Sequence, residues 1–372
     1  MAGGRRFLKM FNFFKKQSFG LDISDHSIEV ICLEGFAKEA KLLAMGRRIL
    51  KPGVVNGGKI LERRRLEAIL LELIKKPQFG EIKKNEVIFS LPESRVFILP
   101  FKIKGNLRNK EIKKEAESQA LHNFPLPPED LYCSLSLKKD DALLVAVPKN
   151  IVEDYLEVFE NIKIRPLALE IESLSLGRAL IEEKEGKILI VDIGSEATNF
   201  SVFDKRKLNV SITIEMAGRQ FSEDLAKELK IPFEEAEILK EKIGLDPEKD
   251  SGRVFMVLQR EIQQIVAEIR RIDDYVFKKE GISFGNVILS GGSATLPNLA
   301  KYLSENIERP VSIGDPWTKI EIDILKGKGY YENALKINPS LYSGAIGSAL
   351  RGLERNPVSC EINLLPERDI FR

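Results

Sequence analysis

The chain has few of the residues that build metal and disulfide sites. Its three cysteines, Cys32, Cys133 and Cys360, are isolated and form no Cys-x-x-Cys pair, and His26 and His122 are the only histidines. The pattern therefore indicates neither a zinc site nor a disulfide framework.

Long hydrophobic runs and a strong net charge are also missing. No run approaches the 18 apolar residues of a membrane-spanning helix, and residues 1–17 lack the apolar core and cleavage site of a signal peptide. The formal net charge is only +2, so no strong positive field argues for nucleic-acid binding. We therefore expect a cytoplasmic protein.

The first 17 residues differ in composition from the rest. Five basic residues without any acid alternate there with large apolar side chains, namely Arg5, Arg6, Lys9, Lys15 and Lys16 with Phe7, Leu8, Phe11, Phe13 and Phe14. One interpretation is contact with an anionic membrane surface. The other, which we favour, is a frayed leader before a true start at Met10.

The length of 372 residues predicts about two domains. Apolar residues make up 43% of the chain and charged residues 31%, which provides both a packed core and a polar surface.

The segment Lys187 to Phe203 reads as a strand, a tight turn and a returning strand. Its turn carries Asp192, Gly194, Ser195 and Thr198. A glycine lets the backbone approach a ligand, exposed N–H groups and hydroxyls bind phosphate oxygens, and Mg²⁺ prefers one or two carboxylates with phosphate and water. The pattern thus predicts a phosphate and metal site, with an ordinary β-hairpin as the alternative.

A second segment of the same kind lies 170 residues earlier. Ser18 to Glu34 is again a strand, an Asp-centred turn and a strand, with Asp22, Ser24 and Ser27 in the turn. Two such segments, each opening half of the chain, indicate a duplicated fold. We expect the two turns to oppose one another and hold one phosphate chain.

A third turn follows the buried strand that begins at Val287. Gly291, Gly292 and Ser293 stand between this strand and a helix expected over about 297–306. Consecutive glycines there let a flat ring or a phosphate lie against the backbone.

The remaining pattern is mixed α/β. Helices are expected over 59–76, 109–122, 151–161, 174–185, 220–229, 232–242 and 253–279. Apolar residues repeat at helical spacing in the last of these and predict a core-facing stripe. Residues 85–165 have the pattern of a compact inserted α+β unit, and the small residues of Ser343 to Leu350 predict close helix packing.

The order of these motifs resembles the actin-like ATPase superfamily. The segments are F-G-L-D-I-S, I-E-S-L-S-L-G-R-A-L, V-D-I-G-S-E-A-T-N, A-E-I-L-K, L-S-G-G-S-A and S-G-A-I-G-S-A-L. Within it, the chain looks most like the PilM family of type IV pilus assembly. The inserted unit resembles the SHS2-like subdomain that PilM shares with the cell-division protein FtsA. The resemblance covers about residues 18–353.

This resemblance implies a duplicated, ribonuclease H-like two-lobed fold and a site for ATP and Mg²⁺. It implies that Asp22 and Asp192 hold the metal and that Asp192 and Glu172 serve catalysis. The other implied ligands of the nucleotide are Gly20, Ser24, Ser27, Gly194, Ser195, Thr198, Glu237, Lys240, Gly291, Gly292 and Ser293. The family usually has Gly at Ser24 and often Lys at Glu29, so we expect at most slow ATP hydrolysis.

The end of the chain resembles a motif of another protein. Residues Ile362, Asn363, Leu364, Leu365 and Pro366 are similar to the cytoplasmic peptide by which the inner-membrane protein PilN docks on PilM. A short extended apolar peptide suits capture by a groove or a sheet edge. We expect a PilN-like partner. For the tail itself three interpretations are open: docking in cis, docking in trans on a neighbouring subunit, or a disordered tail that matches the motif by chance. Pilus assembly ATPases are further possible partners.

The expected domains follow the motifs. They are a tail (1–17), a first lobe (18–84), the insert (85–165), connecting helices (166–186 and 335–355), a second lobe (187–334) and a C-terminal tail (356–372). The resemblance implies an ATP-binding platform, peripheral at the inner membrane through its protein partners, that binds PilN in a nucleotide-dependent way. The alternatives are an FtsA-like division protein, a small-molecule kinase, and a scaffold without nucleotide binding.

Overall fold

The computed structural model describes residues 16–103, 109–138, 141–182, 185–323, 338–359 and 361–366. Most of the basic and apolar N-terminal tail lies outside these ranges. The chain forms two compact units, which we describe separately. Unit 1 contains Met1–Ala179, Pro316–Ile337 and Gly344–Arg372, and unit 2 contains Leu180–Asp315 and Asn338–Ser343.

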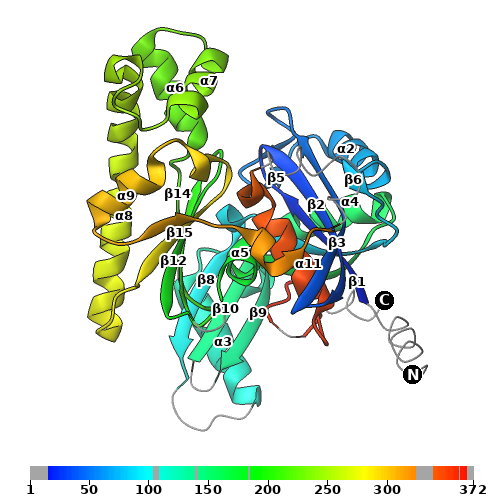
Figure 1. The fold of residues 1–372 in the computed structure, drawn as a ribbon. Helices are drawn as coiled ribbons and strands as arrows, with labels where there is room; N and C mark the ends of the chain where they lie inside the picture. The colour runs from blue at the N-terminus through cyan, green and yellow to red at the C-terminus, as the bar shows by residue number, and fades with distance from the viewer. Residues whose placement is uncertain are drawn as a thin grey trace, which may run out of the picture. The chain divides into compact units, whose positions relative to one another are not determined.

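Unit 1 is built on a mixed sheet in the order β11-β7-β1-β2-β3-β17 (Figure 1). The strands are β1 (Lys16–Ile23), β2 (Ser27–Phe36), β3 (Glu39–Ile49), β7 (Glu86–Leu91), β11 (Arg165–Ile171) and β17 (Ile320–Glu321), with β6 (Phe79–Gly80) beside β3 and a small ribbon of β4 (Val55–Asn56) and β5 (Lys59–Ile60). β1, β2 and β3 are antiparallel, whereas β7 and β11 join as parallel strands.

The helices of unit 1 are α2 (Arg63–Lys75), α4 (Lys149–Asn161), α5 (Glu172–Leu180) and α11 (Ser343–Leu353). α2 and α4 contact each other. The apolar residues Leu66, Leu70 and Leu73 of α2 are buried, as their spacing predicts. The helix expected from residue 59 begins only at Arg63, because the preceding residues form β5.

The inserted unit has its own three-stranded antiparallel sheet, in the order β8-β10-β9. It consists of β8 (Phe97–Lys102), α3 (Asn109–Asn123), β9 (Leu131–Lys138) and β10 (Asp141–Pro148). Ala116 and Ala120 of α3 pack on Leu144 of β10. The insert covers fewer residues than the expected 85–165. The strands at the two ends of that range, β7 and β11, pair with the main sheet of unit 1 and not with the sheet of the insert.

Unit 2 contains a five-stranded sheet in the order β14-β13-β12-β15-β16. Its strands are β12 (Lys187–Ile193), β13 (Thr198–Asp204), β14 (Lys207–Ile214), β15 (Asn286–Ser290) and β16 (Val311–Ile313), and its helices are α6 (Gly218–Leu229), α7 (Phe233–Ile243), α8 (Arg253–Glu280) and α9 (Leu299–Ile307). α9 starts two residues later than expected, since Asn298 adopts a left-handed conformation with φ of 61°.

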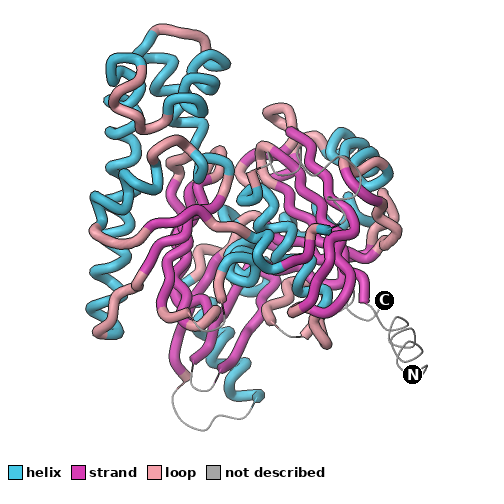
Figure 2. Tube along the Cα trace, viewed as in Figure 1, coloured by secondary structure: helices cyan, strands magenta, loops and turns pink. Residues whose placement is uncertain are grey.

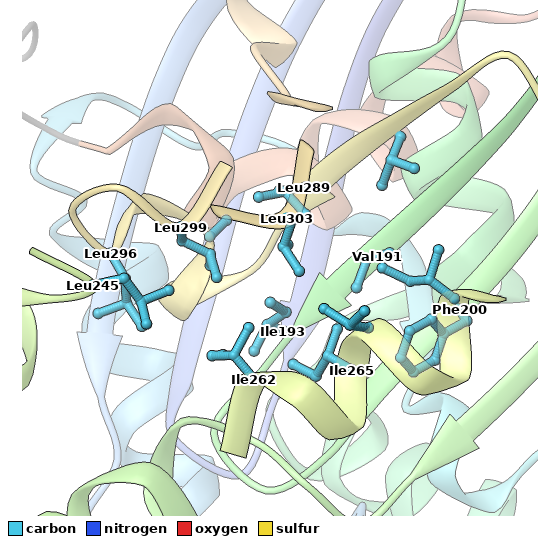
Figure 3. Packing of buried hydrophobic residues seen from close by; sticks show 14 of the residues in the cluster. Val191, Ile193, Phe200, Leu245, Ile262, Ile265, Leu289, Leu296, Leu299 and Leu303 are labelled. Atoms are coloured by element: carbon cyan, nitrogen blue, oxygen red, sulfur yellow. The ribbon is translucent and has the colours of Figure 1, made fainter. Parts of the chain in front are cut away.

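The long helix α8 covers one face of this sheet. Its apolar stripe is buried, and in Figure 3 Ile262 and Ile265 lie with Val191 and Ile193 of β12 in one hydrophobic cluster. Each fully buried aliphatic side chain of this kind contributes roughly 1.5–3 kcal/mol. The prediction of a core-facing stripe is confirmed.

The two sheets repeat one topology. Their strands are magenta in Figure 2. In each sheet, three consecutive antiparallel strands are extended on the side of the first strand by two parallel ones, as β11-β7-β1-β2-β3 and β16-β15-β12-β13-β14. The two Asp-centred turns occupy the same place, between the first and second strands of each unit. The predicted duplication is therefore confirmed. Within the described residues, no helix is both long and apolar enough to span a bilayer.

Candidate functional site

In unit 2 the sheet brings the Asp192 turn beside the Gly291 turn. Asp192 stands opposite Asn199 of β13 and, on its other side, opposite Ser290 of β15. The turn after Asp192 is closed by the Gly194 N–H, which donates to the Ala197 carbonyl at 3.0 Å. Segments nearly 100 residues apart in sequence thus end at the same edge of the sheet.

Gly291 can only be glycine at this place. Its φ is 86°, and an added Cβ would lie 2.5 Å from the carbonyl oxygen of Ile193 and 2.9 Å from Oδ1 of Asp192. The backbone of the turn therefore lies directly against the Asp192 carboxylate. After it, Gly292 is exposed and Ser293 is buried.

Two further segments of unit 2 meet at Gly218, the first residue of α6. Its N–H donates to the carbonyl of Gly194 at 3.0 Å, and an added Cβ would lie 2.4 Å from Oγ of Ser293. The Nζ of Lys240 on α7 donates to the Gly218 carbonyl at 2.8 Å and to the Glu237 carboxylate at 2.8 Å. The structure therefore brings six of the sequence-predicted residues of unit 2 together around Gly218, which was not predicted, namely Asp192, Gly194, Gly291, Ser293, Glu237 and Lys240. A glycine that opens a helix, with three residues between it and the preceding strand, is the signal that would have found it.

Thr198 has a different contact. Its side chain is fully buried, and its hydroxyl donates to the carbonyl of Met216. The fold thus uses Thr198 to close the β13–β14 end, and Ser195, which is half-buried, is left as the hydroxyl of this turn.

In unit 1 the turn after Asp22 is closed by its own side chains. The Ser24 hydroxyl donates to the Ser27 carbonyl at 3.2 Å and accepts the Ser27 N–H at 3.0 Å. Asp22 itself stands opposite Ser90 of β7. The start of α11 approaches it closely, since a Cβ on Gly344 would lie 2.2 Å from Oδ2 of Asp22.

Gly20 has a packing role rather than the expected place beside phosphate. It is buried inside β1, and an added Cβ would lie 2.1 Å from the carbonyl oxygen of Ala345 and 2.5 Å from the amide nitrogen of Ala349. Glycine is required there because α11 crosses directly over the strand.

Sequence reasoning missed a cation at the Asp22 turn. Arg47 of β3 lies across from Glu29, with its Nε 2.6 Å from the carboxylate, and its Nη2 donates to Oγ of Ser27 at 3.2 Å. Burial raises the pKa of Glu29, which Arg47 partly offsets. The neighbouring strand β3 thus supplies a guanidinium beside the Asp22 turn.

Glu172 is the first residue of α5 and is half-buried. The buried carboxylate of Glu93 accepts the N–H of Ser173 at 3.0 Å and so satisfies one of the free donors at this helix start. Glu93 was not predicted, since nothing in its local sequence indicates that it reaches a helix 80 residues away.

Within the described residues, no cluster of three or more His, Cys, Asp or Glu side chains could hold a metal by itself. Asp22 belongs to unit 1 and Asp192 to unit 2.

The C-terminal residues lie against unit 1. Ile362, Leu364 and Leu365 are no more than 4% exposed, and Pro366 is buried. The Leu364 N–H donates to the carbonyl of Leu169 in β11 at 2.8 Å. β11 is the outermost strand at its end of the sheet, so the tail covers an open strand edge.

Two topologically equivalent units with Asp-centred turns define the actin-like fold. A family model described as "Type IV pilus assembly protein PilM" matches residues 20–353. The chain belongs to this family.

Solved structures share the fold. The PilM-PilN type IV pilus biogenesis complex aligns with a TM-score of 0.77 and 20% identity, over 91% of this chain and 98% of that one. The ethanolamine utilization protein EutJ from Carboxydothermus hydrogenoformans aligns with a TM-score of 0.51 and 17% identity, over 90% and 89% of the chains.

Curated relatives are cell division proteins. FtsA of Staphylococcus epidermidis is 27% identical over 232 residues, which is 54% of this chain and 50% of FtsA. FtsA of Bacillus subtilis is 24% identical over 197 residues, 47% of this chain and 45% of FtsA. The chain thus spans about half the length of the curated relatives it matches.

Proposed function

We propose that this chain binds Mg-ATP. The convergence of four segments of unit 2 around Gly218 carries the proposal. There the Gly291 and Gly218 backbones approach their neighbours so closely that only glycine fits, Lys240 supplies a buried cation, and Asp192 supplies a carboxylate at the neighbouring turn. Backbone N–H groups of a glycine turn and a cation suit phosphate, and a carboxylate suits Mg²⁺. Within unit 1, Asp22 and Ser27 at the equivalent turn are proposed as candidate metal and phosphate ligands, and Glu172 as a candidate group that orients water.

We further propose that the chain is a cytoplasmic platform of type IV pilus assembly at the inner membrane. Membership of the PilM family and the fold shared with PilM in its PilN complex support this role. The partner would be the N-terminal peptide of a PilN-like membrane protein, bound with an affinity that depends on nucleotide.

Thermal denaturation with Mg-ATP tests nucleotide binding. At a concentration 100 times the dissociation constant, a ligand stabilises the folded state by about 2.7 kcal/mol, which raises Tm by roughly 5 °C. Asp192→Asn should abolish this rise. Asp204→Asn, at the opposite end of the same hairpin, is the matched control and should keep it. Glu172→Gln should keep the rise but lower any phosphate release.

An unchanged Tm of the unmodified chain at millimolar Mg-ATP would contradict nucleotide binding and support the scaffold alternative. An equal rise in Asp192→Asn would remove Asp192 from the site while leaving nucleotide binding in place.

A further inference from the structure

The tail residues 361–366 bind unit 1 through specific polar contacts as well as apolar burial. Asn363 makes most of them. Its Oδ1 accepts the N–H groups of Leu169 and Leu365, each at 3.1 Å, its Nδ2 donates to the Val358 carbonyl at 3.1 Å, and its own N–H donates to Oγ of Ser134 at 3.0 Å. Asparagine fits because the position needs both a side-chain acceptor and a donor.

The floor of this site carries an unbalanced buried charge. Two buried arginines, Arg178 of α5 and Arg351 of α11, share the single buried carboxylate of Glu170, at 2.8 and 2.9 Å. The tail supplies a second carboxylate and a carbonyl acceptor to these two arginines. Glu361 pairs with Arg178, and the Ile362 carbonyl accepts from Nη1 of Arg351 at 2.6 Å. Without the tail, the two buried guanidinium groups would share only the Glu170 carboxylate, and an unbalanced charge is costly in a buried site.

The tail is attached by a short connection. α11 ends at Leu353, and residues 354–359 turn the chain back before Glu361. A tethered segment of this length faces its site at an effective concentration in the millimolar range. A free peptide for the same groove must therefore compete against an occupant that is always present.

We propose that the groove of Ser134, Leu169, Arg178 and Arg351 is a peptide-docking site occupied in cis by residues 361–366, which must leave before any partner peptide binds. The site selects an acidic residue followed by apolar, Asn, apolar, apolar and Pro positions. This inference deepens the proposed partner binding and rests on it for its biological role.

Fluorescence anisotropy with a labelled synthetic peptide of residues 361–366 tests the proposal on the full chain. Asn363→Ala loses the side-chain hydrogen bonds of the tail, so we expect it to bind the peptide at least about 10-fold more tightly than the unmodified chain. Asn356→Ala is the matched control, because Asn356 is exposed in the preceding turn, and should bind like the unmodified chain. A peptide with Lys in place of Glu361 should bind Asn363→Ala at least about 10-fold more weakly.

A second measurement needs no substitution. The Leu364 amide should be protected from hydrogen exchange in the unmodified chain, and excess peptide should reduce that protection. Equal peptide affinity in the unmodified chain and Asn363→Ala, no peptide binding by either, or an unprotected Leu364 amide would overturn the proposal. Asn363→Ala should keep its response to Mg-ATP. The peptide measurements therefore test the docking site, and the Mg-ATP measurement tests nucleotide binding, so that either proposal can fail without the other.

Discussion

Glu170 links three elements of unit 1 through one carboxylate. Its Oε1 accepts from Arg178 Nη1 at 3.0 Å and from the Ser175 hydroxyl at 2.8 Å, and its Oε2 accepts from Arg351 Nη1 at 2.9 Å. Burial alone would raise the pKa of Glu170. The two guanidinium groups outweigh burial and lower it to about 2. The carboxylate therefore stays ionised and joins β11, α5 and α11 beneath the tail.

Glu170→Gln should destabilise unit 1 by about 3–5 kcal/mol, since it leaves the buried Arg351 without a carboxylate and leaves Arg178 with only that of Glu361. Chemical denaturation measures this loss. Gln119→Glu on the inserted helix α3 is the control for a change of charge. Gln119 is half-buried whereas Glu170 is fully buried, so this substitution should alter stability by less than about 1 kcal/mol.

The same carboxylate predicts a pH dependence. The folded-state pKa of Glu170 is lower than its unfolded value. Its contribution is therefore fully present above about pH 4.5 and is lost as the pH falls toward 2. The free energy of unfolding should fall less steeply over this window in Glu170→Gln than in the unmodified chain. Identical slopes would show that Glu170 does not titrate there.

At the scale of elements, α11 depends on small residues where it crosses its neighbours. An added Cβ on Gly347 would lie 1.9 Å from the carbonyl oxygen of Ser175 in α5, and one on Gly352 would lie 1.9 Å from Oγ of Ser18 in β1. The small-residue face predicted from the sequence is thus a packing face, which brings Arg351 and Ser348 within reach of Glu170.

Gly347→Ala should lower the free energy of unfolding. Alanine favours a helix by about 1 kcal/mol over glycine, but a backbone contact of 1.9 Å forces the two helices apart, and overpacking costs about 1–3 kcal/mol. Gly186→Ala, whose added Cβ meets no atom within 4 Å, is the control and should be nearly neutral. A Gly347→Ala protein as stable as the unmodified one would contradict this packing role.

At the scale of the whole molecule, the chain repeats one sheet topology and adds an insert and a tail to unit 1 alone. Unit 2 holds the candidate nucleotide residues around Gly218, and unit 1 holds the candidate peptide groove. A ligand at one site changes affinity at the other only if it binds two states of the protein differently.

Nucleotide dependence therefore has a direct test. In Asn363→Ala, where the tail is held less tightly, the dissociation constant of the 361–366 peptide should change by about 5-fold or more with Mg-ATP, the lower end of usual coupling. The Asp192→Asn, Asn363→Ala double variant should lose the change. Equal peptide affinity with and without Mg-ATP would show that the two sites are uncoupled.

The sequence by itself determined the repeated strands, the turns at Asp22 and Asp192 and the buried stripe of α8, because each follows from local periodicity and turn chemistry. Tertiary structure decided what each glycine packs against, since Gly20 meets the backbone of α11 whereas Gly291 meets Ile193 and the Asp192 carboxylate. It also decided the partners of Glu93, Arg47 and Glu170. Those contacts join distant segments, and their charges are balanced only when the whole chain has folded.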